Sequence, residues 1–232
     1  MSVNASILSI ESKNNQSFGT GFVIYNDKKG SYIITASHVI DEVEVPMIEN
    51  REVEVIVQKT FSDLALLYLE GIFLEPLPLQ ISHCSGEVKI IGFSCFAKKS
   101  VQKMTLKGRI QEEFIEVQSK ENEASTLVRK IFADKDFHFE RGNSGSPVFC
   151  TETNKVIAMV GYKEKNSVAF AMDIASVQNI SKEIPQEIFQ NHQGEKKKRR
   201  WLYYLFVVPA LITVIYVVMS SLLLAFLRIF QV

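Results

Sequence analysis

The sequence has little cysteine and no cluster of residues with metal-binding spacing. Its three cysteines, Cys84, Cys95 and Cys150, form no CxxC motif and no Cys/His cluster. An odd number of cysteines without such spacing argues against a disulfide framework and against a zinc site. We therefore predict no metal and no cofactor, and we expect small buried thiols in a reducing compartment. A bond between Cys84 and Cys95 stays open, because two strands could bring them together.

The sequence also lacks a net charge, although its charges are unevenly placed. Residues 1–195 carry 20 Lys and Arg against all 26 Asp and Glu, whereas residues 196–232 carry six basic residues and no acid. The mildly acidic first part has no basic face of the kind that binds nucleic acid, so we expect no nucleic-acid partner. The first six residues lack the basic and long apolar regions of a secretory signal.

Helical periodicity is scarce from Ile7 to about Phe170. Short runs rich in aromatic and β-branched residues dominate instead, and turn residues separate them. The clearest runs are residues 18–25, 31–36, 52–57, 64–69, 87–93, 114–118, 147–150, 156–161 and 168–172. Short strands without helices between them are typical of an antiparallel sandwich or barrel. With 47% hydrophobic residues, the chain can bury a sizeable core, and an all-β fold is predicted.

The pattern changes after the last of these runs. Between residues 173 and 189, isoleucine or valine recurs at spacings of three and four, which predicts a short amphipathic helix. The apolar positions are Ile174, Val177, Ile180, Ile184 and Ile188. Pro185 lies inside this run and is expected to break or kink the helix.

A second strong signal is a run of 26 residues, 202–227, without a charged side chain. About 20 apolar residues suffice to cross a bilayer, so residues 201–228 are predicted to form a transmembrane helix, with a buried core helix as the alternative. Five basic residues, 196–200, directly precede it, and such residues stay on the cytoplasmic side. We therefore expect a tail-anchored chain whose bulk faces the cytoplasm, with the lipid bilayer as a partner and Arg228 on the far side.

Three further stretches contain residues that could carry chemistry. His38 follows a hydrophobic strand in Thr-Ala-Ser-His-Val, Asp63 begins an apolar strand in Asp-Leu-Ala-Leu-Leu, and Ser144 lies within Arg-Gly-Asn-Ser-Gly-Ser-Pro. A nucleophilic serine needs glycine neighbours that let its oxygen stand clear of the backbone. A simple turn is the alternative interpretation of the serine motif. The chain order of histidine, aspartate and serine is that of chymotrypsin.

Residues 15–180 resemble the trypsin-like (chymotrypsin-fold) serine peptidases, most closely the bacterial HtrA/Deg-like and glutamyl-endopeptidase-like branch. The resemblance implies two antiparallel β-barrels, divided near residues 75–100, with the active site between them. It implies Ser144 as nucleophile, His38 as general base and Asp63 as the acid that orients the histidine. The backbone amides of Gly142 and Ser144 would form the oxyanion hole.

The resemblance also suggests residues that contact substrate. His138 lies six residues before Ser144, where the family places the base of the specificity pocket, and could favour acidic or polar side chains. Gly161 and Ala169 fall in the two strands that wall the cleft. Asn143 replaces the aspartate through which trypsin-type zymogens are activated, so that activation mechanism is not expected. No C-terminal PDZ domain is expected, and the predicted anchor is at the opposite end from that of HtrA enzymes.

These features together predict three segments: a peptidase domain over residues 1–182, a linker over 183–200 and a transmembrane helix over 201–228. The expected function is a membrane-anchored serine endopeptidase that cleaves protein or peptide substrates on the cytosolic side. One alternative is a catalytically silent protease-fold scaffold or sensor at the membrane. Another is a viral-type processing protease. The oligomeric state is left open.

Overall fold

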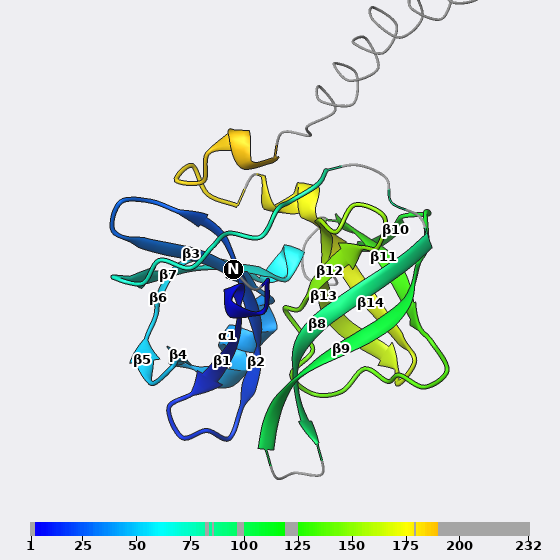
Figure 1. Ribbon diagram of the computed structural model, residues 1–232, viewed down its shortest axis with the longest axis horizontal. Helices are drawn as coiled ribbons and strands as arrows, with labels where there is room; N and C mark the ends of the chain where they lie inside the picture. Colours follow the sequence, from blue (N-terminus) through cyan, green and yellow to red (C-terminus); the bar gives the residue numbers. More distant parts are fainter. Residues whose placement is uncertain are drawn as a thin grey trace, which may run out of the picture. The chain divides into compact units, whose positions relative to one another are not determined.

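The computed structural model describes residues 3–81, 84, 86–96, 100–118, 125–178 and 180–189, and of residues 3, 4, 96, 100, 118 and 125 it describes the backbone only. The described residues build two seven-stranded antiparallel sheets. Figure 1 shows the first sheet in blue and cyan and the second in green and yellow. The all-β double-barrel fold predicted from the sequence is confirmed.

The first sheet uses the chain up to Glu70 and has the strand order β5-β4-β1-β2-β3-β7-β6. Its strands are β1 Ile7–Ser12, β2 Phe18–Asn26, β3 Gly30–Thr35, β4 Pro46–Ile48, β5 Arg51–Glu52, β6 Glu54–Lys59 and β7 Leu64–Glu70. The 3₁₀ helix η1 (Val3–Ser6) precedes β1, the helix α1 (Ser37–Val43) follows β3, and η2 (Thr60–Ser62) precedes β7.

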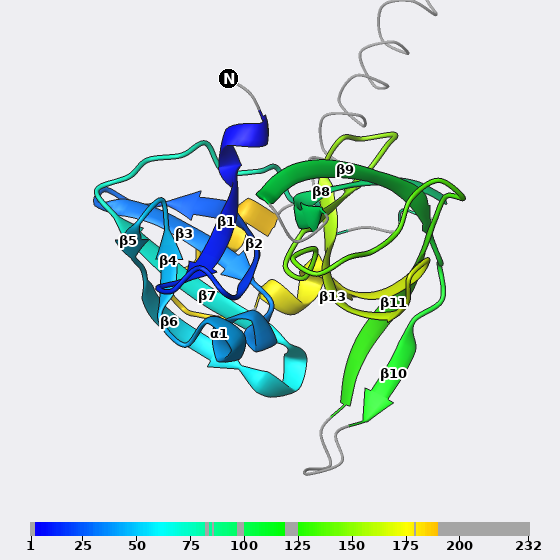
Figure 2. The ribbon, with the colours of Figure 1, turned by 90° about the horizontal axis from the view of Figure 1, so that it is seen from below.

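The second sheet begins at Gly86 and has the order β10-β11-β14-β13-β12-β8-β9, closed by an additional pairing of β9 with β11. Its strands are β8 Gly86–Phe96, β9 Ser100–Ile110, β10 Ile115–Gln118, β11 Ser125–Ala133, β12 Pro147–Cys150, β13 Val156–Lys165 and β14 Val168–Asp173. Figure 2 shows how β8 and β9 curve around this second barrel.

The chain passes from the first sheet to the second through residues 71–85. This connection is hydrogen-bonded to both sheets. The backbone amide of Leu77 donates to the Val23 carbonyl, and the backbone amide of Gln80 donates to the Val156 carbonyl. Both barrels have cores of β-branched and aliphatic side chains, as expected for strands packed on one face. One core cluster joins residues of the first barrel to Ile91, Val156 and Met172 of the second.

The prediction of one amphipathic helix between residues 173 and 189 is wrong. Two 3₁₀ helices, η3 (Ile174–Val177) and η4 (Gln186–Phe189), form instead. Pro185 lies just before η4, and a proline inside a continuous helix would clash with the preceding turn and remove a hydrogen bond. The apolar spacing nevertheless identified buried residues, since Ile174, Val177, Ile180 and Ile184 are all in the core.

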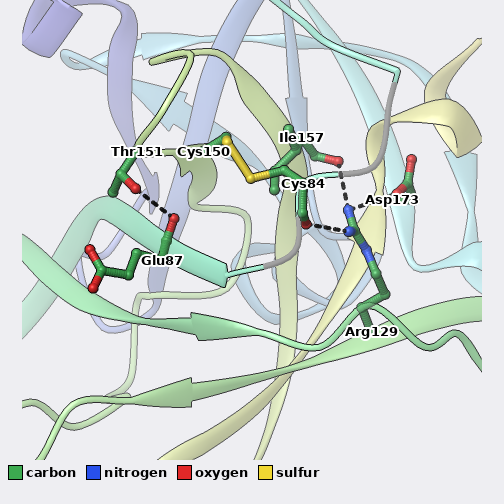
Figure 3. Close-up of a disulfide and its surroundings, with 7 residues drawn as sticks. All are labelled: Cys84, Glu87, Arg129, Cys150, Thr151, Ile157 and Asp173. Atoms are coloured by element: carbon green, nitrogen blue, oxygen red, sulfur yellow. Dashed lines mark hydrogen bonds and ion pairs between the residues drawn. A yellow bond between two sulfur atoms is a disulfide. The ribbon is translucent and has the colours of Figure 1, made fainter.

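Two of the three cysteines form a disulfide, Cys84–Cys150, which Figure 3 shows beside Arg129. The expectation of free buried thiols is therefore wrong for this pair, and Cys95 is the free cysteine. Cys84 and Cys150 are 66 residues apart in sequence, and their spacing gave no sign of pairing. The barrel brings them together because β12 pairs with β8, whose first residue follows Cys84 closely.

No helix among the described residues is long and apolar enough to cross a membrane. The predicted transmembrane helix, residues 201–228, and the basic residues 196–200 lie outside the described residues.

Candidate active site

His38 lies in the first turn of α1, directly beyond the end of β3. The pairing of β3 with β7 sets Thr35 opposite Ala65. The segment that follows β3 and the segment that precedes β7 therefore lie at the same end of these two strands. Antiparallel register thus brings His38 close to Asp63, although 25 residues separate them in sequence.

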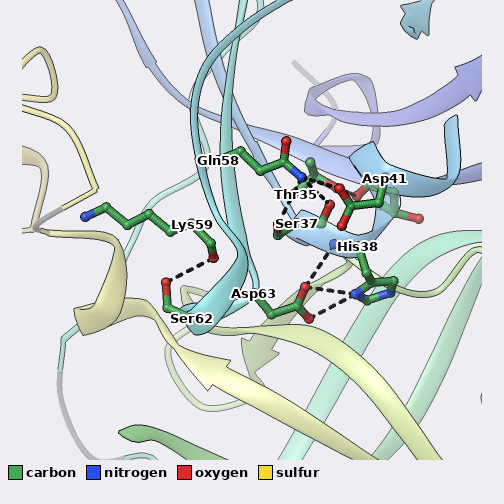
Figure 4. Close-up of polar contacts among 9 residues, drawn as sticks. Thr35, Ser37, His38, Asp41, Gln58, Lys59, Ser62 and Asp63 are labelled. Carbon is green, nitrogen blue, oxygen red and sulfur yellow. Dashed lines mark hydrogen bonds and ion pairs between the residues drawn. The ribbon is translucent and has the colours of Figure 1, made fainter. Parts of the chain in front are cut away.

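Asp63 accepts hydrogen bonds from two N–H groups of His38, and its two carboxylate oxygens share the one from the ring, as Figure 4 shows. The Nδ1 atom of His38 lies 2.9 Å from Oδ1 and 3.0 Å from Oδ2, and the backbone amide of His38 lies 3.1 Å from Oδ1. Asp63 has a left-handed backbone, with φ 48°, a conformation that aspartate tolerates better than most residues. The carboxylate therefore fixes both the ring and the backbone of His38.

The pKa of His38 is raised above its ordinary value of 6.5. Burial acts to lower the pKa, but the hydrogen bond and the negative charge of Asp63, together with the charges of Glu42 and Asp41, outweigh that effect. Because Nδ1 donates to Asp63, the other ring nitrogen, Nε2, is left to accept a proton.

Two other acids that lie near the motifs in sequence do not take this role. Asp41 accepts a hydrogen bond from the Gln58 side chain at 2.7 Å, and Asp134 is exposed in the turn after β11. The histidine partner is thus the aspartate that the chain order predicted.

The loop that contains Ser144 depends on two glycines with positive φ. Gly142 has φ 96° and Gly145 has φ 84°, values that side-chain-bearing residues rarely adopt. A Cβ on Gly142 would collide with the Phe18 ring, and one on Gly145 would collide with the Thr20 carbonyl. Only glycine fits at these positions, so the serine motif has a packing reason as well as a chemical one.

Ser144 and His38 line one cleft of about 550 Å³. The backbone amides of Gly142 and Ser144, predicted to form the oxyanion hole, donate to no backbone carbonyl in the part of the chain that the structure describes. Such amides are available to a developing negative charge. The cleft is lined by residues 17–18, 38–39, 42, 139–144 and 160–163.

Of the three residues predicted to contact substrate, the structure places one in the cleft. Gly161 lines it, and a Cβ there would lie 3.2 Å from Oδ2 of Asp63. His138 is exposed and Ala169 is buried in the second core, and neither lines the cleft. Phe139, the neighbour of His138, takes a place in the wall instead.

Sequence reasoning missed several residues of the cleft wall. Phe18, Val39, Tyr162 and Lys163 all line it. Each lies one or two residues from a motif position, and that adjacency was the one signal that could have identified them. A register shift in the pairing of β13 with β14 between Val160 and Lys163 brings Tyr162 and Lys163 into the wall, and bulges of this kind leave no clear sequence signature.

No group of three or more His, Cys, Asp or Glu side chains arranged to hold a metal ion occurs within the described ranges. What these residues offer is an oriented histidine, a serine on a glycine loop and backbone amides. That set is suited to acyl transfer.

Two antiparallel barrels with a histidine–aspartate pair and a serine at one cleft define the chymotrypsin-like class of folds. Residues 19–159 match the model of the trypsin-like peptidase domain. The chain therefore belongs to the trypsin-like peptidase family. No curated protein sequence matches the chain at a significant level.

Solved structures with the same fold include serine proteases from two bacteria. The Rv3671c protease of Mycobacterium tuberculosis H37Rv, in an inactive mutant form, aligns with a TM-score of 0.60 and 20% identity over 77% of this chain and 85% of that one. Its active form gives 0.59 and 20% over 77% and 80%. A serine endoprotease from Yersinia pestis gives 0.54 and 19% over 77% and 64%. Together with the family, these neighbours support a serine endopeptidase.

Proposed function

We propose that this chain cleaves proteins by an acyl-enzyme mechanism in which Ser144 is the nucleophile, His38 the general base and Asp63 the orienting acid. The observation that carries the proposal is the pair of contacts from His38 Nδ1 to both carboxylate oxygens of Asp63, at 2.9 and 3.0 Å. His38 and Ser144 line the same cleft. The family supports the reaction class, and these contacts support the assignment of the residues.

The steps follow from the protonation state of His38. Ser144 Oγ attacks the peptide carbonyl while its proton moves to Nε2 of His38, and Asp63 stabilises the imidazolium that results. The amides of Gly142 and Ser144 bind the oxyanion, at about 3–4 kcal/mol for one such donor. Collapse of the intermediate passes the proton to the leaving amine, and water then releases the acyl group by the same route.

The cleft supports a protein or peptide substrate. Its volume of about 550 Å³ lies in the range of ordinary ligand sites, roughly 300–1,000 Å³. Its walls mix apolar residues, such as Phe18, Phe139 and Val160, with the charged Glu140 and Lys163. A few side chains of an extended polypeptide could occupy it, and no metal or cofactor enters the mechanism.

Cleavage of casein by the full chain tests this proposal. Ser144→Ala should abolish cleavage while leaving the thermal unfolding temperature unchanged. Ser146→Ala is the matched control, because Ser146 is fully buried and its hydroxyl has no hydrogen-bond partner within the described residues. We expect that variant to keep full activity. Equal activity of the Ser144→Ala variant and the wild type would contradict the mechanism, and absence of cleavage by a folded wild type would favour a silent scaffold.

We also propose that residues 201–228 anchor the chain in a membrane with the peptidase domain on the cytosolic side. The support is the uncharged run of 26 residues and the five basic residues before it. The Cys84–Cys150 disulfide favours the opposite side, because disulfides persist in oxidising compartments.

Membrane fractionation tests the anchor, and alkylation of intact cells with a membrane-impermeant maleimide tests the side. The proposal predicts that the chain fractionates with membranes through residues 201–228 and that Cys95 is not labelled until the membrane is opened. Labelling of Cys95 in intact cells would show that the peptidase domain faces the other side of the membrane. Recovery of the chain in the soluble fraction would refute the anchor.

A further inference from the structure

The Ser144 loop is held in place by a threonine of the other barrel. Thr20 lies on β2 in the first sheet and is fully buried. Its Oγ1 donates to the Gly142 carbonyl at 2.7 Å, across 122 residues of sequence. Its backbone amide donates to the Ser144 carbonyl at 2.9 Å. One residue of β2 thus binds the carbonyls on both sides of Asn143.

A second strand, β8, completes this arrangement. The amide of Phe93 on β8 donates to Thr20 Oγ1 at 2.9 Å, and the carbonyl of Phe93 accepts from the Asn143 side chain at 3.1 Å. The hydroxyl of Thr20, the backbone of Phe93 and the Gly142–Asn143 peptide therefore close a ring of hydrogen bonds. The ring joins the two barrels at the loop that contains Ser144.

The hydroxyl of Thr20 acts in this ring both as donor and as acceptor. A valine has nearly the same shape but can do neither, so it would leave the Gly142 carbonyl and the Phe93 amide without this partner. A serine keeps both roles and loses only a methyl group. These two substitutions separate the hydrogen bonds of Thr20 from its packing.

We propose that Thr20 is a positioning residue that fixes the peptide planes around the oxyanion hole and the nucleophile. The Ser144 amide belongs to the peptide between the two carbonyls that Thr20 binds, and the Gly142 amide adjoins the first of them. Release of the Gly142 carbonyl lets these planes rotate, and small misplacements of catalytic groups reduce rates strongly. This inference rests on the proposed function, because it assigns Thr20 a role in the same acyl transfer.

The test is the reaction of the full chain with a fluorophosphonate, measured as a maximal rate constant, kinact, and a half-saturating concentration, KI. For Thr20→Val we expect kinact to fall roughly 10- to 100-fold, as for the loss or misplacement of an oxyanion donor. We expect KI to stay within about threefold, since the lost interaction acts in the transition state. Thr20→Ser should restore kinact.

Thr35→Val is the matched control. Thr35 is also fully buried, and its hydroxyl donates to the Thr20 carbonyl at 2.7 Å and not to the serine loop. A general loss of barrel stability would lower kinact to a similar degree in both valine variants, whereas positioning by the Thr20 hydroxyl lowers it much more for Thr20→Val than for Thr35→Val. Thermal unfolding of each variant is measured in parallel, and Thr20→Ala provides a second hydroxyl-free variant if the valine prevents folding.

Wild-type kinact in a folded variant without the hydroxyl would overturn the inference. So would a Thr20→Ser variant that reacts as slowly as Thr20→Val, because packing and not hydrogen bonding would then be responsible. A wild type that reacts no faster than Ser144→Ala would instead refute the proposed function, so the two failures are distinguishable.

Discussion

Arg129 donates a 2.8 Å hydrogen bond to Asp173 from a guanidinium that is almost completely buried inside the second barrel. Figure 3 shows the same guanidinium directed at the carbonyls of Cys84 and Ile157. Asp173 also caps η3, since its other carboxylate oxygen accepts from the Ala175 amide at 2.9 Å. This ion pair therefore connects β11 to the end of β14 and the start of η3.

Substitution of Asp173 by alanine should destabilise the fold strongly. The change leaves the buried charge of Arg129 without its partner, a loss of about 3–5 kcal/mol in comparable buried pairs. The measurement is urea unfolding of the full chain, monitored by circular dichroism.

The exposed pair formed by Lys130 and Glu164, at 3.0 Å, provides the control. Glu164→Gln should cost no more than about 1 kcal/mol, as is usual for surface pairs. Equal losses for Asp173→Ala and Glu164→Gln would show that the Arg129 charge does not depend on Asp173.

Removal of the disulfide should also lower stability. Cys84 and Cys150 close a loop with a sequence separation of 66, for which the entropy of the unfolded chain predicts about 4 kcal/mol. The comparison is urea unfolding of Cys150→Ala against Cys95→Ala, which removes a cysteine outside the bond. If both variants unfold at the same urea concentration as the wild type, the bond contributes nothing under the conditions used.

The pH dependence of labelling should report the raised pKa of His38. The base must be neutral to accept the serine proton, so the rate should fall as the pH drops through a pKa above the ordinary value of 6.5. In Asp63→Asn the raising effect of the carboxylate is lost while burial, which lowers the pKa, remains. Nuclear magnetic resonance of the His38 ring should therefore show a lower pKa in that variant, and an unchanged pKa would contradict the assigned partner.

Tyr68 should titrate far above an ordinary tyrosine. Burial and a 3.0 Å hydrogen bond to Asp27 raise its pKa to about 12. The ultraviolet absorbance of tyrosinate, recorded against pH for the wild type and for Tyr68→Phe, isolates this group. Asp27→Asn should move the transition to lower pH, and a Tyr68 transition near 10 in the wild type would rule out the contact with Asp27.

Much of the fold followed from local patterns. Alternation and β-branched runs predicted most strands, and the order of His38, Asp63 and Ser144 predicted the double barrel through its resemblance to a family. The spacing of Ile174, Val177 and their successors predicted burial correctly but not the conformation. Pro185 interrupted the helix, while the apolar side chains still packed on the core.

The remaining features depend on contacts between distant segments. The pairing of Cys84 with Cys150 follows from β12 lying beside β8, and the exposure of His138 follows from the path of one loop. The two bonds of Thr20 to the Ser144 loop need both barrels in place. Short-range patterns carry no information on such contacts, which is why the family's position six residues before Ser144 pointed to His138, whereas the cleft wall uses Phe139.

The most direct test of the account is the site of covalent modification by a fluorophosphonate, found by mass spectrometry of the full chain and its peptides. We predict one adduct per chain, on Ser144 and not on Ser146, and its loss in the His38→Ala variant. An unmodified Ser144 in the folded wild type, or an adduct that forms equally well without His38, would contradict the proposed triad.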